Sequence, residues 1–135
     1  MQHRENAKVE LLKRVPFFAG LSAGELDAVA TAAEESTVPA GATLLSQATP
    51  GGDVVVLLDG AAAIEKDGET IGAIGPGDVV GEIGVVMRMR RTASGTTTMP
   101  SHLLVIEADA FRSLLDRIPA LAKGAWKATN ARLEP

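Results

Sequence analysis

The stretch GPGDVVGEIGVVMRMRRTAS, residues 75–94, indicates both a fold and a binding site. It opens with a tight turn at residues 75–78, continues through the apolar pair Val79-Val80, and ends in a basic loop that closes with Arg91. The residues after Gly81 are predicted to form one helical turn, whose first N–H groups lack partners within the helix. Such N–H groups and the positive end of the helix dipole favour an anion. We therefore interpret the segment as a phosphate-binding loop.

Three side chains extend this interpretation from a phosphate to a sugar phosphate. Glu82 would be repelled by an anion, so we interpret it as an acceptor for the hydroxyl groups of a neutral diol such as ribose. Arg91 supplies a positive charge, and its planar guanidinium suits phosphate oxygens better than a lysine would. Thr92 adds a hydroxyl group beside it. Without a ligand, Glu82 and Arg91 would form an exposed ion pair, typically worth less than ~1 kcal/mol.

The segment resembles the phosphate-binding cassette of cyclic nucleotide-binding domains, which occur in cAMP receptor proteins, kinase regulatory subunits and cyclic-nucleotide-gated channels. The family pattern is Gly-Glu-aliphatic-Ala/Gly, a short loop, and then Arg-Ala/Ser/Thr-Ala, and residues 81–84 and 91–93 match it. The resemblance implies that Glu82 binds the ribose 2′-hydroxyl, that Arg91 binds the cyclic phosphate, and that backbone amides cradle the phosphate oxygens. The ligand contacts that it implies are Val80, Gly81, Glu82, Ile83, Gly84, Arg91, Thr92 and Ala93.

The resemblance leaves the identity of the base open. Thr92 is able to bond either a phosphate oxygen or the exocyclic amine of a guanine, and the family contains both cAMP- and cGMP-binding members with threonine here. We expect cAMP to be slightly favoured over cGMP as the ligand. Trp126 is a further candidate contact, since an aromatic side chain on the last helix would stack on the purine. Its alternative role is to pack that helix against the barrel.

The composition describes one globular domain. The chain has 135 residues, 46% of them hydrophobic, which suits a single domain with a core of its own. It contains no cysteine, which excludes disulfides. Its apolar runs are too short to span a bilayer and its N-terminus lacks a signal-like apolar segment, so we expect a cytoplasmic protein. The net charge of −4 argues against direct binding of nucleic acid.

The N-terminal part is predicted to be helical over residues 5–34. Apolar residues recur at helical spacing on both sides of Pro16, and Ser22 with Glu25 three residues later forms a capping-box pattern. The first apolar stripe contains Val9, Leu11, Leu12 and Val15, and the second contains Leu26, Val29, Ala30 and Ala33. This segment also resembles the helical part that precedes the barrel of cyclic nucleotide-binding domains.

Short β-rich runs follow up to residue 108, separated by turns that contain Gly, Pro and Asp. Asp67-Gly68 is a two-residue hairpin signal between runs 61–66 and 69–74, and 54–58 is an apolar run typical of a strand buried on both faces. We predict a mainly β fold with flanking helices. It is an eight-stranded antiparallel β-roll, similar to a jelly-roll barrel, with N-terminal helices and two C-terminal helices.

The predicted division of this one domain is a helical segment at 1–36, a β-roll at 37–108 and a hinge and lid at 109–135. Strands are expected at 93–99 and 103–107. Asp109 is expected to cap a helix that presents Phe111, Leu114 and Leu115 on one face, and Pro119 to precede a last helix at 120–133. The chain ends soon after that helix, which fits either a free-standing sensor or a regulatory piece of a longer protein.

The predicted function is regulatory binding of a cyclic nucleotide, cAMP or cGMP, without catalysis and without a cofactor or metal. The expected partners are an effector protein or a second copy of the chain. One alternative is a degenerate member of the fold that binds no nucleotide and serves as an interaction module. A second is a metal-dependent barrel enzyme, for which His3 and His102 are the only histidines available.

Overall fold

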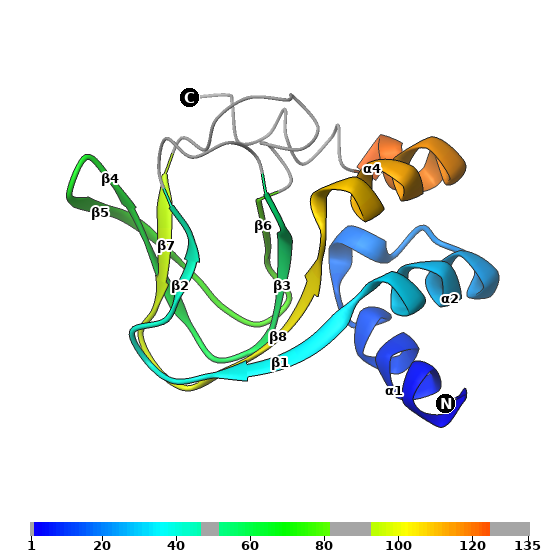
Figure 1. Ribbon diagram of the computed structural model, residues 1–135, viewed down its shortest axis with the longest axis horizontal. Coiled ribbons are helices and arrows are strands. Elements are labelled where there is room, and N and C mark those ends of the chain that lie inside the picture. The colour runs from blue at the N-terminus through cyan, green and yellow to red at the C-terminus, as the bar shows by residue number, and fades with distance from the viewer. Residues whose placement is uncertain (1, 47–51, 82–92, 125–135) are drawn as a thin grey trace.

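The computed structural model describes residues 2–46, 52–81 and 93–124, with side chains from residue 7 onward. Within these residues, eight antiparallel strands form two four-stranded sheets that face each other as a β-roll, with the helices packed outside one sheet (Figure 1). One sheet has the order β1-β8-β3-β6 and the other β2-β7-β4-β5. The strands are β1 (Glu34–Val38), β2 (Thr43–Leu45), β3 (Val54–Asp59), β4 (Ala62–Lys66), β5 (Glu69–Ile74), β6 (Val79–Val80), β7 (Ser94–Thr97) and β8 (Ser101–Ile106). The predicted fold class is confirmed.

The N-terminal segment folds as α1 (Gln2–Leu12), a 3-10 turn η1 (Pro16–Phe18) and α2 (Ala23–Ala32). The predicted capping box is present: the Ser22 hydroxyl accepts from the Glu25 N–H at 3.2 Å, and the Glu25 carboxylate accepts from the Ser22 N–H at 2.8 Å. Lys8 of α1 donates to the carbonyls of Ala33 at 2.7 Å and Ala30 at 3.1 Å, where α2 ends. These bonds supply donors to carbonyls at the end of α2, where the Ala30 carbonyl also accepts from the Ala33 N–H at 3.3 Å. They join the two helices at the end from which β1 departs.

β3 is buried on both faces, as the apolar run predicts. Val54 and Val56 face the helices, where they join Leu104 and Ile106 of β8 in the main core. Val55 and Leu57 face the interior of the roll and pack with Val80 and Leu103. The period of two along a strand thus divides the apolar side chains of β3 between two clusters.

The hairpin between β4 and β5 forms at the predicted residues. Asp67 and Gly68 have φ values of 52° and 83°, the positive values that a tight hairpin turn requires. The register shifts farther along the hairpin, where Ile64 pairs with Gly72 but Glu65 pairs with Thr70. This shift leaves Ile71 as an extra residue on β5, with its side chain 58% exposed.

Several predicted boundaries were wrong. β1 already begins at Glu34, inside the stretch predicted as helix, because it pairs with β8 from Glu34 opposite Val105. β7 ends at Thr97, before the predicted 99, because the Thr97 hydroxyl donates to the Pro39 carbonyl and accepts from the Ala42 N–H, both at 2.8 Å. β8 begins at Ser101, two residues before the predicted start.

The predicted cap at Asp109 was also wrong. Helix α4 (Ala108–Arg117) has Glu107 at its N-cap position, and no side chain bonds there. Asp109 lies inside the first turn, where its carboxylate complements the helix dipole and contacts Arg112 at 3.0 Å. Phe111 and Leu114 are buried as predicted, and Leu115 is partly buried against the same core. Residues 119–124 are helical after the break at Ile118, and the remainder of the predicted last helix lies outside the described residues.

Gly60 offers a test of the packing between β3 and β8. Its φ is 110°, and a Cβ atom there would lie 2.2 Å from Oγ and 2.8 Å from Cα of Ser101. We expect Gly60→Ala to lower the free energy of unfolding by more than about 2 kcal/mol, since it adds a clash with backbone to the strain of a positive φ. Urea unfolding monitored by circular dichroism measures the loss.

Gly41→Ala is the matched control, because Gly41 has a φ of 86° but open space around its Cβ position. The Gly41→Ala substitution should lower the free energy of unfolding by only about 1 kcal/mol, the cost of the positive φ without a clash. Equal losses in the two variants would contradict the close approach of Ser101.

Candidate ligand-binding site

The described flanks of segment 82–92 of the predicted cassette lie at one end of the roll. β6 ends at Val80, which pairs with Val55 near the start of β3, and β7 begins next to Gly95, which pairs with Leu45 at the end of β2. Figure 1 shows these strand ends on the same side of the molecule. We call this end, marked by Leu45, Val54, Val80 and Ser94, the mouth of the roll. The sheet register therefore brings the flanks of segment 82–92 together.

The turn before β6 is fixed by four hydrogen bonds. The Gly75 N–H donates to the Asp78 carboxylate at 2.8 Å, and the Asp78 N–H donates back to the Gly75 carbonyl at 3.2 Å. Gly77 and Asp78 also bond the backbone of Leu57 in β3, with distances of 2.7 and 2.9 Å. The start of β6 is thus held against a strand that is itself buried on both faces.

Gly81 has a backbone conformation that favours glycine. Its φ is 92°, in the left-handed region that L side chains rarely adopt, and it directly follows Val80, which is 3% exposed. The family pattern predicts a glycine here as a ligand contact. The structure gives a second reason for this glycine, because the chain leaves β6 through it with a positive φ.

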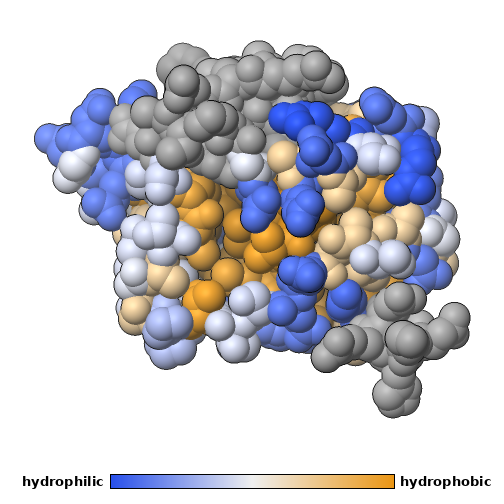
Figure 2. Space-filling model, viewed as in Figure 1, coloured by the Kyte–Doolittle hydropathy of each residue, from blue (hydrophilic) through white to orange (hydrophobic). Residues whose placement is uncertain are grey.

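An apolar surface lies between the sheets. The buried members of this interior cluster are Val55, Leu57, Val80 and Leu103, and the partly buried side chains packed against them are Val38, Leu44, Leu45, Ile74 and Val105. Figure 2 looks onto apolar residues in the space between the two sheets. Every member of the cluster is aliphatic, so this surface suits the apolar faces of a sugar or a base rather than a charge.

Only part of the predicted site can be compared with the structure. Val80, Gly81 and Ala93 are described: Val80 is buried in the interior cluster, and Gly81 and Ala93 are half-buried at the mouth. The positions predicted at Glu82, Ile83, Gly84, Arg91, Thr92 and Trp126 lie outside the described residues. Sequence reasoning did not find the inward-facing residues of β2 and β3, although the apolar run 54–58 predicted that alternate residues of this strand face a second buried surface.

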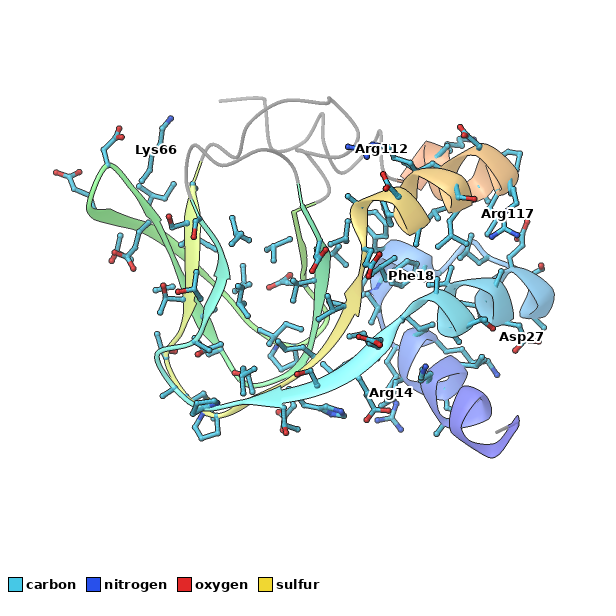
Figure 3. All side chains as sticks on the ribbon, in the orientation of Figure 1. Arg14, Phe18, Asp27, Lys66, Arg112 and Arg117 are labelled. Carbon is cyan, nitrogen blue, oxygen red and sulfur yellow. The ribbon has the colours of Figure 1, made fainter. Side chains whose placement is uncertain are left out.

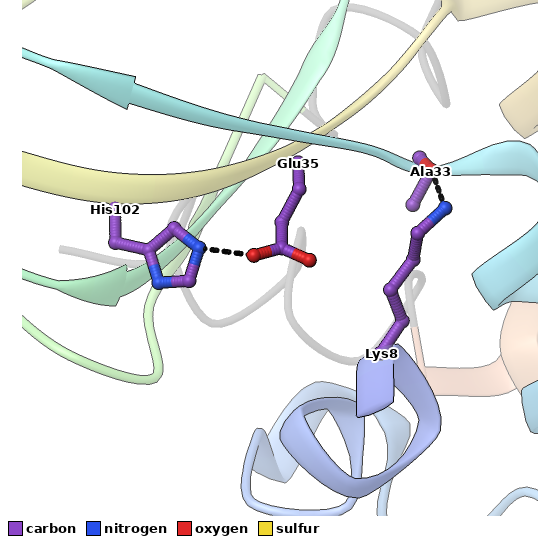
Figure 4. Close-up of polar contacts among 4 residues, drawn as sticks. All are labelled: Lys8, Ala33, Glu35 and His102. Atoms are coloured by element: carbon purple, nitrogen blue, oxygen red, sulfur yellow. Dashed lines mark hydrogen bonds and ion pairs between the residues drawn. The ribbon is translucent and has the colours of Figure 1, made fainter. Parts of the chain in front are cut away.

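The histidine of the barrel-enzyme alternative lies away from this interior. His102 alternates with Leu103 along β8, so it projects from the outer face, and its Nε2 contacts the Glu35 carboxylate at 2.6 Å (Figure 4). Lys8 reaches the Ala33 carbonyl nearby. In the part of the chain that the structure describes, no three side chains of His, Asp or Glu gather as metal ligands would.

The comparison with protein families adds to this geometry. Residues 35–118 match the model of the cyclic nucleotide-binding domain, and this match covers more than half of the chain. The chain belongs to the cyclic nucleotide-binding domain family. The matched residues begin in β1 and end just after α4, so the family match includes the whole roll and the mouth.

Individual relatives support the same assignment. The chain is 25% identical over 129 residues to a CRP-like cAMP-activated global transcriptional regulator of Mycobacterium tuberculosis, covering 92% of this chain and 58% of that protein. The regulatory domain of Toxoplasma gondii PKA, solved with cAMP, superposes with a TM-score of 0.83 at 21% identity and covers 96% of this chain and 51% of that one.

A third relative is similar in fold but is described with another ligand. It is the regulatory subunit of a cAMP-independent protein kinase A from Trypanosoma cruzi bound to guanosine, with a TM-score of 0.81 at 21% identity over 90% of this chain and 44% of that one. The chain spans between 11% and 58% of the length of the curated relatives it matches. None of the described helices is long and apolar enough to cross a membrane.

Gly81→Ala tests the conformation at the exit from β6. An alanine must adopt the φ of 92° or displace the first residues of the cassette, so we expect a loss of about 1 kcal/mol in the free energy of unfolding. Gly75→Ala is the control, because Gly75 has no positive φ and its Cβ position is open. Chemical denaturation of both variants measures the difference, and a Gly81→Ala variant as stable as Gly75→Ala would refute the strained exit.

Proposed function

We propose that this domain binds a 3′,5′-cyclic mononucleotide, with cAMP favoured over cGMP, and that binding regulates a partner. The supporting observation is the position of Gly81 and Ala93, the described flanks of the cassette, at the mouth beside the apolar interior. A sugar phosphate has an anionic end and an apolar side. A cassette rich in N–H donors next to an aliphatic surface matches both.

The proposed roles follow the family pattern residue by residue. Arg91 pairs with the cyclic phosphate, Glu82 accepts from the ribose 2′-hydroxyl, and the amides of Ile83, Gly84 and Ala93 donate to phosphate oxygens. Thr92 bonds the phosphate or the base. Val80, in the interior cluster, packs against the ribose, and Trp126 stacks on the purine.

Regulation would proceed by a shift between two populations of the helices. α4 is anchored in the main core by Phe111, whose ring lies 6.4 Å from that of Phe17, and Phe17 in turn contacts Phe18 edge-on at 5.1 Å. α4 starts at the mouth and packs in the same core as the N-terminal helices. A change in the position of α4 would therefore also affect those helices. The ligand must bind the closed arrangement more tightly than the open one, because only differential affinity moves such an equilibrium.

The alternative function is that of an interaction module without a nucleotide. The similarity to a cAMP-independent kinase subunit favours keeping this alternative, because that protein shares the fold and is described with guanosine. The cytoplasmic location, the absence of catalysis and of direct nucleic-acid binding, and an effector protein or second copy as partner are further parts of the proposal.

Isothermal titration calorimetry with cAMP and cGMP, and with 5′-AMP as control, tests the proposed function. We expect micromolar or tighter binding of one cyclic nucleotide and no heat with 5′-AMP, because the proposed contacts fit a cyclic phosphodiester and 5′-AMP carries an open phosphomonoester instead. Guanosine is included as the phosphate-free ligand. If none of these compounds binds, the proposed nucleotide binding is wrong, and the alternative of an interaction module for a protein partner is favoured.

Arg91→Ala tests the proposed phosphate contact. Loss of a charge-assisted bond to a bound anion should weaken cAMP binding by at least about 30-fold, since removing one partner of a buried charged pair costs roughly 2 kcal/mol or more. Arg88→Ala is the matched control, because Arg88 belongs to the same basic loop but stands outside the family pattern, and it should change the affinity by less than about twofold. Equal affinities of the two variants would remove Arg91 from the site.

A further inference from the structure

Lys8 of α1 caps the end of another helix. Its ammonium group donates to the carbonyls of Ala33 at 2.7 Å and Ala30 at 3.1 Å, at the C-terminal end of α2 (Figure 4). Helix α2 has no basic residue in its own last turn. A cation at this position complements the negative end of the helix dipole and bonds the last carbonyls. Lys8 therefore supplies from α1 the cap that the sequence of α2 lacks.

The Lys8 ammonium is held by backbone rather than by a carboxylate. In the part of the chain that the structure describes, no Asp or Glu side chain pairs with it. Figure 4 shows the Glu35 carboxylate directed at His102 instead, with 2.6 Å between Oε2 and Nε2. The two carbonyls belong to the buried residues Ala30 and Ala33. A buried acceptor that loses its donor destabilises a structure, so this contact favours one docked position of α1.

The rest of the attachment of α1 is small. Among the described helices and strands, α2 alone packs against α1 over several residues. From residue 7 onward, α1 places two side chains in the main core, Val9 and Leu12. The helix has 11 residues, and isolated helices shorter than roughly 12–15 residues are marginal in water. The helical state of α1 therefore depends on its docking to α2.

The element that follows α1 is anchored separately. Phe18 of η1 is 1% exposed and lies in the main core (Figure 3), and Val15 just before η1 is buried as well. Between Val15 and the end of α1 lie Lys13 and Arg14, which are both exposed. A change of backbone conformation at these two residues would release α1 from α2 while η1 stays in place.

We propose that α1 is a strap that opens and closes on α2 as a unit, and that Lys8 is the latch that holds it closed. The latch ties α1 to the point where α2 passes into β1, because Ala33 directly precedes Glu34. Opening exposes the buried end of α2 at Ala30 and Ala33, so the strap controls access to this surface. The latch contains none of the residues assigned to the nucleotide and is independent of the proposed function.

Hydrogen–deuterium exchange followed by mass spectrometry tests the strap in the wild type. The amides of α1 should exchange at least about tenfold faster than those of β3 and β8, because a terminal helix with few buried contacts opens locally, whereas central strands open with the whole domain. Protection of α1 equal to that of β3 would overturn the proposal without any substitution.

Two variants, Lys8→Met and Lys13→Met, test the latch. Methionine keeps an unbranched apolar side chain but removes the charge and the donors. Lys13 is the matched control, because its side chain is 52% exposed and contacts Glu10 at 3.0 Å, three residues away along the chain. Circular dichroism confirms that both variants are folded before exchange is measured.

Lys8→Met should raise the exchange rate of α1 by about tenfold to a hundredfold, as expected for the loss of hydrogen bonds from a charged group. The rates in β3 and β8 should change by less than about twofold, and Lys13→Met should leave α1 within about twofold of the wild type. An increase of equal size in α1, β3 and β8 would overturn the strap as a separate unit. Equal rates for α1 in Lys8→Met and Lys13→Met would overturn the latch.

Discussion

The structure depends on one strand that is buried on both faces. β3 contributes Val54 and Val56 to the core under the helices and Val55 and Leu57 to the interior of the roll. Burying a side chain of this kind stabilises the fold by roughly 1.5–3 kcal/mol, so disrupting either cluster would strongly destabilise the domain. A shift of one residue in its register would exchange the two sets. β3 therefore fixes the helices and the roll relative to each other.

The position of the candidate site follows from that constraint. β6 has only two residues, too few to be stable on its own, and it is held by its pairing with β3 and by the bonds of the 75–78 turn to Leu57. Segment 82–92 of the cassette follows Gly81, the residue directly after β6. Its opposite flank is set in the other sheet, where β7 pairs with β2 and β4. The described flanks of segment 82–92 therefore belong to facing sheets and lie at the mouth.

Local patterns predicted those features that local chemistry determines. The Ser22 capping box, the hairpin at Asp67-Gly68 and the buried run 54–58 form as predicted, because each depends on neighbouring residues or on strict alternation. Glu34 was misassigned because a tertiary contact overrides local preference: pairing with β8 draws it into a strand. Asp109 was misassigned because the helix already begins at Ala108, with Glu107 at the N-cap position. Of the candidate site, the sequence predicted the cassette and missed the inward-facing residues Val55, Leu57 and Leu103 of the interior cluster. Only the pairing of distant strands places these residues at the interior surface next to Val80.

Few residues separate the mouth of the roll from helix α4 along the chain. Ile106, the last residue of β8, lies opposite Val54 and is buried in the main core, and Glu107 alone separates it from α4. The same core contains Phe111, Val29 and Leu12, so α4, α2 and α1 share one packed cluster. Packed interiors do not deform gradually, because each side chain fills the space left by its neighbours. A displacement of α4 at the mouth must therefore either be resisted by this cluster or move the helices to a second arrangement, and this is the physical requirement for a binding domain that acts as a switch.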